Sequence, residues 1–334
     1  MSDEGSHSDD SGVEEMLYRD LADAHCHPHD DENALRALPD TKCPKMCVMG
    51  TRPDDWPVVE DFVAAAREKH GKEATPSFGL HPWFAHLFAA PSASGTSEDD
   101  HDRAADKTAH YATVLRDDRR KQDEEDVSLG GRSQPVFVRA EDLPEPIPAD
   151  LWMRQLREVL HRNPEAVLGE IGFDAVAALR TGPYCKIGVP RGSITSTFCS
   201  LDHQRAIFRA QMRLAAELQR PVSIHSVRTQ GVLVEELKLL MDEHLASSAA
   251  AVASAKRFSS SAAAMPPSVC LHSYSGSAET VESLVKMFEK AKGGRRSKRD
   301  QARFCPEDDE SEGDESQDDE EVRPRLSTPE IFFS

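Results

Sequence analysis

The stretch VLGEIGFD, residues 167–174, places Glu170 within a short run of apolar residues. A run of this length and composition is typical of a strand buried in a parallel sheet. Burial of a glutamate is unfavourable unless its carboxylate is paired or bound to a metal ion. The stretch therefore predicts a core strand over residues 166–171 that carries a functional carboxylate at its carboxyl end.

Similar short apolar runs alternate along the chain with longer amphipathic stretches. The predicted strands are Leu21–His25, Lys45–Gly50, Ala74–Leu80, Ala166–Ile171, Val222–His225, Val269–Ser273 and Glu330–Ser334. The predicted helices are Trp56–Lys69, Leu151–Arg162, Leu201–Leu218, Gly231–His244 and Ala278–Ala291. Alternation of strands and helices indicates a parallel sheet with crossover helices.

The length of 334 residues, with 38% hydrophobic residues, allows a sizeable core. One large domain with insertions is expected, because single α/β barrels commonly reach about 250 residues. Residues 1–16 are predicted to be a disordered acidic N-terminus, and residues 17–334 to form the barrel. Three low-complexity stretches, at about 91–145, 245–267 and 292–328, are predicted to be insertions in loops or helix connections.

The net charge of −19 is concentrated in two acidic segments. Residues 1–15 and 306–321 together hold 17 carboxylates and no lysine or arginine. The acidity is therefore assigned to solvated tails or insertions, and it does not exclude a polyanionic substrate at a locally positive pocket. The run at 306–321 also has a second interpretation, as an acidic insertion that binds a basic protein partner.

The cysteines and the apolar runs indicate the cellular compartment. The seven cysteines are scattered and include no C-x-x-C pair, which favours free thiols in a reduced compartment. No apolar run approaches the roughly 18–20 residues that a membrane span needs, and the N-terminus is acidic. We therefore expect no membrane segment, and a cytoplasmic or nuclear location.

Histidines stand at the ends of three more predicted strands. His25 and His27 close the first strand, His225 ends PVSIH, and His272 ends VCLH. The carboxyl ends of parallel strands meet at one mouth of a barrel, where active sites are built. Any one of these histidines could be a core or a solvent-facing residue, but the whole set, with Glu170, favours a site for Zn²⁺, Mn²⁺ or a similar ion.

Taken in order, five blocks resemble the signature blocks of the TatD family of metal-dependent deoxyribonucleases. The blocks are DAHCH, SFGLHPWF, VLGEIGFD, PVSIHS and LHSYSG, and the helix before PVSIHS carries Gln204, Phe208 and Gln211. The resemblance extends over residues 21–290, apart from the insertions. It implies the α/β fold class with a TIM (β/α)₈-type barrel of the metal-dependent amidohydrolase type, two divalent metal ions (Zn, Mn or Mg), and phosphodiester hydrolysis with DNA as the substrate.

The resemblance assigns a role to each ligand position. His25 and His27 bind the first ion, Glu170 bridges both ions as a catalytic residue, and His225 and His272 complete the second site. Two such ions can clamp the attacking and leaving oxygens of a phosphoryl displacement, with a metal-bound hydroxide as the nucleophile.

Four further residues have expected roles beside these ligands. His81, in GLHPW, is expected to act in catalysis by donating a hydrogen bond to the substrate phosphate, the alternative being that it only shapes its loop. Arg228 is expected to bind phosphate, although the commoner family form, H-S-R, places the arginine one residue earlier. Asp23 is expected to hydrogen-bond the histidines of the first strand, and Asp174 to support the Glu170 loop.

Other residues near the mouth are not assigned to the metal site. His29, Asp30 and Asp31 are expected to lie in a solvated loop. Trp83 has two interpretations, stacking on a nucleobase or packing within the protein.

The resemblance breaks at the carboxyl end of the chain. The family closes its barrel with an eighth strand whose aspartate binds the first ion, and this sequence has no such block. Residues 329–334 look like the seventh strand with Glu330 at its amino end, so an incomplete barrel of about seven strands is expected. The chain is then either a truncated enzyme or a catalytically impaired homologue that acts as an interaction protein. An amidohydrolase acting on small amide or ester substrates is a further alternative.

Overall fold

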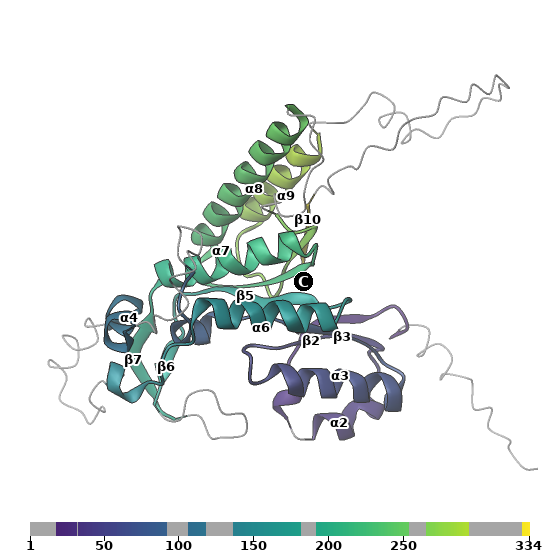
Figure 1. The fold of residues 1–334 in the computed structure, drawn as a ribbon. Coiled ribbons are helices and arrows are strands. Elements are labelled where there is room, and N and C mark those ends of the chain that lie inside the picture. Colours follow the sequence, from purple (N-terminus) through teal and green to yellow (C-terminus); the bar gives the residue numbers. More distant parts are fainter. Residues whose placement is uncertain are drawn as a thin grey trace, which may run out of the picture.

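The structure, a computed structural model, describes residues 18–31, 33–91, 106–117, 136–181, 192–253, 265–293 and 329–334 (Figure 1). Its main sheet has seven strands in the order β1-β2-β3-β5-β8-β9-β10, and all neighbours are parallel. The strands are β1 (Ala22–Cys26), β2 (Lys45–Met49), β3 (Glu73–Phe78), β5 (Val167–Asp174), β8 (Val222–Val227), β9 (Ser268–Leu271) and β10 (Glu330–Phe333). All seven predicted strands are therefore present.

The sheet is strongly curled. β1 and β9 are five strands apart in the order, which in a flat sheet would separate them by about 24 Å. The imidazole rings of His25 and His272, which lie at the carboxyl ends of these two strands, nevertheless stack with centroids 3.8 Å apart. Only a sheet that bends back toward itself allows this contact, so the predicted incomplete barrel of the TIM type is confirmed.

Helices cover the sheet on its outer side. They are α3 (Trp56–His70), α6 (Ala149–Arg162), α7 (Leu201–Glu217), α8 (Gln230–Ala253) and α9 (Ala278–Gly293), with the short α2 (Ala34–Ala37) before β2. α3 packs on β2 and β3, α7 on β5, and α8 on β5 and β8. The five predicted helices are thus confirmed as crossover elements, and none of the described helices is long and apolar enough to cross a bilayer.

A small second sheet was not predicted. It has the order β4-β7-β6, with β4 (Leu115–Asp117), β6 (Ala178–Arg180) and β7 (Ile194–Cys199), and both pairings are antiparallel. With α4 (Lys107–Val114) it stands to the left in Figure 1, over its own core of Tyr111, Val114, Val138, Leu143 and Leu179. These strands are too short and too polar to give a clear pattern in the sequence.

Parts of the predicted insertions are regular structure. Within 91–145 the chain forms α4, β4 and the 3₁₀ turn Ala140–Asp142, and within 245–267 α8 continues to Ala253. Residues 92–105 and 118–135 of the first stretch, residues 254–264 of the second, the acidic N-terminus and residues 294–328 lie outside the described residues. Of the seven cysteines, the five that are described have free thiols.

Two glutamines of α7 connect this helix to the carboxyl side of the sheet. The buried amide of Gln211 bonds the backbone N–H and C=O of Leu80, at 2.7 and 3.2 Å. The amide of Gln204 bonds both backbone groups of Asp174, at 2.9 and 3.0 Å. These hydrogen bonds between neutral amide groups satisfy buried backbone groups where the strands end, so α7 fixes the loops that follow β3 and β5.

The close approach of β5 and β8 at Gly172 gives a stability prediction. Gly172 has a φ of 140°, and a Cβ there would lie 2.0 Å from the carbonyl oxygen of His225. We expect Gly172→Ala to lower the free energy of unfolding by more than ~3 kcal/mol. Gly71→Ala is the control, because Gly71 also has a positive φ, of 62°, but an added Cβ would meet no atom within 4 Å. It should lose only ~1 kcal/mol in urea denaturation, and equal losses for the two variants would contradict the prediction.

Candidate metal centre

The carboxylate of Glu170 is the centre of a cluster at the carboxyl ends of the strands. Glu170 is only 3% exposed, and ring nitrogens of five histidines lie within 3.5 Å of its two oxygens. The histidines are His25 on β1, His27 after β1, His81 after β3, His225 on β8 and His272 after β9. The structure therefore brings together all five predicted ligands and His81.

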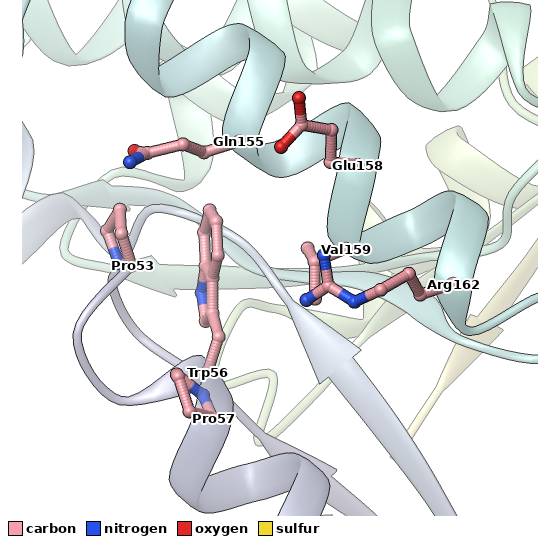
Figure 2. A pocket seen from close by; sticks show the side chains of 7 residues that line it. All are labelled: Pro53, Trp56, Pro57, Gln155, Glu158, Val159 and Arg162. Carbon is pink, nitrogen blue, oxygen red and sulfur yellow. The ribbon is translucent and has the colours of Figure 1, made fainter.

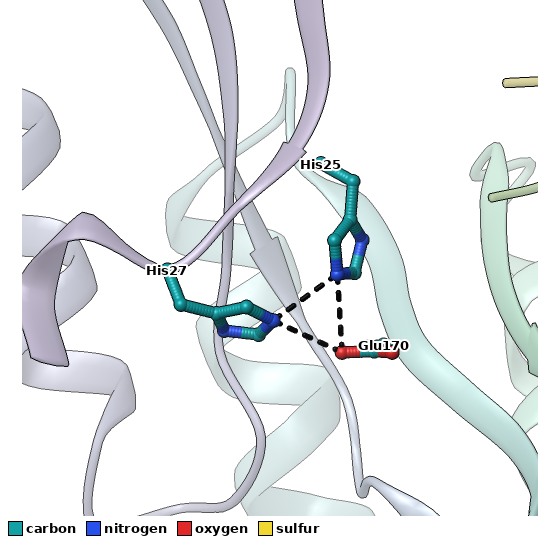
Figure 3. Close-up of side chains that lie close together, drawn as sticks. All are labelled: His25, His27 and Glu170. Atoms are coloured by element: carbon teal, nitrogen blue, oxygen red, sulfur yellow. Dashed lines mark hydrogen bonds and ion pairs between the residues drawn. The ribbon is translucent and has the colours of Figure 1, made fainter. Parts of the chain in front are cut away.

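One side of the carboxylate faces the histidines of the first strand (Figure 3). The Nε2 atoms of His25 and His27 are 3.1 Å apart, and they lie 3.5 and 3.2 Å from Oε2 of Glu170. Ligands that share one ion at bond lengths of about 2.1 Å are separated by roughly 3 to 3.5 Å. These three atoms thus have the spacing and chemistry of a shared coordination sphere.

The other oxygen of the carboxylate, Oε1, faces three more histidines. It lies 2.7 Å from Nδ1 of His225, 2.8 Å from Nε2 of His272 and 3.3 Å from Nε2 of His81. His81, Glu170 and His225 form a second set whose candidate ligand atoms lie within 4.8 Å of one another. Among the described residues Glu170 is common to both sets, which is the position that a bridging carboxylate requires.

The backbone around His81 decides which of its nitrogens carries a proton. The backbone N–H of Trp83 donates to Nδ1 of His81 at 3.1 Å, so the proton of the neutral ring lies on Nε2. Burial lowers the pKa of His81, which keeps the ring neutral although Glu170 opposes this effect. His81 is therefore arranged as a hydrogen-bond donor toward the site more than as a metal ligand.

Asp174 contacts several groups at the end of β5. Its Oδ2 accepts a hydrogen bond from the indole Nε1 of Trp83 at 2.8 Å and lies 3.3 Å from Nε2 of His225. Its Oδ1 accepts from the backbone N–H groups of Val176 and Ala177, both at 2.8 Å. A carboxylate on the far nitrogen of a candidate ligand fixes the orientation of the ring.

Two other predicted residues lie at the edge of the cluster. The Asp23 carboxylate accepts a hydrogen bond from the backbone N–H of His25 at 3.0 Å, so its contact with this histidine is made through the backbone. Arg228 is exposed on the loop after β8, with a left-handed φ of 53°.

One contact of the cluster and the burial of one side chain were not predicted from the sequence. Ser223 of β8, which is 2% exposed, lies with Oγ 3.0 Å from Nδ1 of His272. Its position two residues before His225, on the same face of the strand, was the available signal. The imidazole of His29 is 1% exposed instead of solvated, because the turn Pro28–Asp30 points it inward, whereas Asp30 and Asp31 are exposed as expected.

The pKa values of the histidines around the carboxylate are shifted in different directions. Burial lowers the pKa of His25 to about 3. Burial alone would also lower the pKa of His225, but hydrogen bonds with Asp174 and Glu170 outweigh it and raise the pKa to about 9. The surrounding histidines keep the pKa of Glu170 well below its usual value although burial opposes ionisation. The carboxylate is therefore ionised across the physiological range.

A separate cavity lies away from these residues. It has a volume of about 160 Å³ between α3 and α6, and Figure 2 shows its lining of Pro53, Trp56, Pro57, Gln155, Glu158, Val159 and Arg162. None of these side chains belongs to the histidine cluster. The cavity offers no comparable set of metal ligands.

Comparisons with known proteins agree with the resemblance of the blocks. A family model described as TatD related DNase matches residues 22–290. The chain is similar to the Cut9-interacting protein scn1 of Schizosaccharomyces pombe, with 35% identity over 79% of this chain and 74% of that protein. It is 29% identical to an uncharacterized deoxyribonuclease of Saccharomyces cerevisiae, over 78% of this chain and 68% of that protein.

A solved structure is also similar. The crystal structure of a TatD homologue from Escherichia coli matches with a TM-score of 0.40 and 18% identity. The match covers 80% of this chain and 65% of that chain, so the chain spans slightly less than two thirds of the solved relative.

Removal of two histidines of the first candidate set is expected to lower metal binding. We expect His25→Ala/His27→Ala to bind one equivalent of Zn²⁺ or Mn²⁺ fewer than the unmodified chain, because two of three ligands are removed on one side of Glu170. Equilibrium dialysis followed by metal analysis measures the stoichiometry. The control is His70→Ala/His161→Ala, which removes two histidines of outer helices α3 and α6. Equal stoichiometry in all three proteins would contradict the assignment.

The shifted pKa values predict a stability maximum near pH 6.5 when a chelator is present. Below that pH, His25 and His81 bind protons only after unfolding, since their pKa values are lowered, so stability falls as pH falls. Between pH 6.5 and about 9, His225 is protonated only in the folded chain, so stability falls as pH rises. Urea denaturation at several pH values measures both limbs. His225→Asn should flatten the upper limb, and an unchanged upper limb would contradict the prediction.

Proposed function

The chain belongs to the TatD-related DNase family, and on this basis we propose that it is a metal-dependent hydrolase that cleaves phosphodiester bonds in DNA. The observation that carries the proposal is the convergence of five strand-end imidazoles on the buried carboxylate of Glu170. Several potential ligands around one shared carboxylate are what a pair of divalent ions requires.

In this proposal His25 and His27 would hold one ion, His225 and His272 would hold the other, and Glu170 would contribute to both. The ions, Zn²⁺, Mn²⁺ or Mg²⁺, would supply Lewis-acid charge to the attacking and leaving oxygens of the phosphodiester. The ligand chemistry of imidazole and carboxylate favours Zn²⁺ or Mn²⁺ over Mg²⁺. Ser223 orients His272, and Asp174 orients His225, through the hydrogen-bond contacts on their other ring nitrogens.

Two more residues give the site its preference for phosphate. The neutral ring of His81 presents its Nε2–H toward the cluster, where it can donate to a non-bridging phosphate oxygen. Arg228 places a cation on the exposed loop after β8, three residues beyond His225, where it can meet the next phosphate of a polynucleotide. Asp23 acts on the backbone of β1 and has no direct part in the chemistry.

Two other functions remain as candidates for this chain. The first is hydrolysis of small amide or ester substrates, which the same ligand chemistry supports. The second is binding of a protein partner, which the name of the S. pombe relative favours. The acidic segment 306–321, predicted to bind a basic partner, lies outside the described residues. The cytoplasmic or nuclear location stays a prediction.

Substitution of the central carboxylate tests the proposed function. We expect Glu170→Gln to lower the release of nucleotides from end-labelled single- or double-stranded DNA by at least ~100-fold, because both sets lose their shared ligand. The assay contains Mn²⁺, Mg²⁺ or Zn²⁺. Glu68→Gln is the matched control, because Glu68 is exposed on α3, which packs on the outer side of the sheet, and it is not among the residues around Glu170.

The outcomes separate the three candidates. Loss of activity in Glu170→Gln and full activity in Glu68→Gln support a metal-dependent nuclease. Cleavage of small esters or amides without cleavage of DNA would select the amidohydrolase function. A folded chain that binds metal and cleaves neither class of substrate would contradict both hydrolytic functions and leave partner binding as the candidate.

A further inference from the structure

We propose that the indole ring of Trp83 is a stacking platform for the nucleobase next to the cleaved phosphodiester bond. The inference rests on the proposed function and extends it, because it names the part of the substrate that lies beside the metal centre. It concerns a position for which the sequence left both stacking and packing open.

The exposure of Trp83 sets it apart from the other tryptophans. Trp83 is 43% exposed, whereas Trp56 and Trp152 are 3% and 0% exposed. Its neighbours in the 3₁₀ turn Pro82–Leu87 are buried, since Ala85 and Leu87 are each 1% exposed. The turn is therefore anchored by its other residues, while part of Trp83 is accessible to solvent.

The ring is held in one orientation. Its Nε1–H donates to Oδ2 of Asp174 at 2.8 Å, and the backbone N–H of the same residue donates to Nδ1 of His81 at 3.1 Å. Pro82 restricts the backbone immediately before it. Because the polar atom of the indole is already bonded within the protein, the exposed part offers an apolar, fixed aromatic surface. Such a surface binds a ligand with little loss of conformational freedom.

The position of the ring relates it to the site. Its centroid lies 4.8 Å from that of His81 and 6.5 Å from that of His225. Oδ2 of Asp174 contacts both the indole and Nε2 of His225. A phosphate that accepts a hydrogen bond from His81 therefore has the indole as its neighbour, at the place where the attached nucleoside must lie. Stacking on an aromatic ring suits every base, since each has a π face, so the platform implies little sequence preference.

A nucleobase test distinguishes stacking from a purely structural role. The substrates are a single-stranded oligonucleotide and the same oligonucleotide with abasic residues at its terminal positions. We expect the unmodified chain, with Mn²⁺, to show a kcat/KM about 5- to 100-fold higher on the base-bearing substrate. Trp83→Leu should bring this ratio close to one, and Trp83→Phe, which keeps an aromatic face but lacks the N–H, should preserve most of it.

If Trp83 acts only through Asp174, the results differ. Leucine and phenylalanine variants would then lower kcat/KM on both substrates alike, because each loses the bond to Asp174, and the ratio would stay unchanged. That outcome, or a ratio near one in the unmodified chain, overturns the stacking proposal.

Fluorescence provides a readout that does not need turnover. With a chelator present, stacking should quench the emission of the exposed Trp83 when the base-bearing oligonucleotide is added, and the abasic one should quench far less. The buried Trp56 and Trp152 supply a constant background, and Trp83→Phe should abolish the difference. Base-dependent quenching in the chelator, together with no cleavage in the Mn²⁺ assay, overturns the nuclease function and supports the platform. Cleavage in the Mn²⁺ assay without base-dependent quenching supports the nuclease function and overturns the platform. If neither cleavage nor quenching occurs, both proposals are overturned.

Discussion

The buried negative charge of Glu170 is the constraint on which the site depends. A carboxylate that is 3% exposed stays ionised only if nearby groups compensate for its lost hydration. Five imidazoles do so, and they come from the ends of β1, β3, β8 and β9. Each of these strands must end at the same height for its histidine to reach the carboxylate. The registers agree with this requirement, since Gly172 of β5 pairs with His225 of β8, and Ile224 of β8 pairs with Leu271, the residue before His272.

The same requirement explains the curvature of the sheet. Histidines from the first and sixth strands can meet only if the sheet curls back toward itself, and the stacked rings of His25 and His272 show that it does. Within the described residues β1 and β10 remain the two edges. Glu330 begins β10, opposite Ser268 at the start of β9, so its carboxylate stands at the end of the sheet away from the histidines. It cannot reach the cluster from there. The sequence predicted this place for Glu330, at the amino end of the strand.

Much of the fold and of the candidate site was predictable because each core strand carries its own signal. An apolar run that ends in histidine or glutamate locates both a strand and a member of the cluster, and this holds for Glu170, His225 and His272. The contacts that sequence reasoning missed lack such a signal. Ser223 is one of many serines, and only the pairing of β8 with β9 brings it to His272. Burial of His29 depends on the direction of a three-residue turn, and the small sheet is held by tertiary packing more than by propensity.

The histidines around Glu170 differ in the proton that a cation has to displace. At neutral pH the ring of His25 is already neutral, because burial lowers its pKa to about 3, so its nitrogen has a lone pair available. His225 carries a proton up to a pH of about 9, held between Glu170 and Asp174. Binding of a cation at His225 must release this proton, and binding at His27, whose pKa is also raised, releases one as well, whereas binding at His25 releases none. Affinity on both sides of Glu170 therefore rises with pH. Asp174, which bonds Trp83 and faces His225, thus links the charge of that side of the site to the aromatic surface at its mouth.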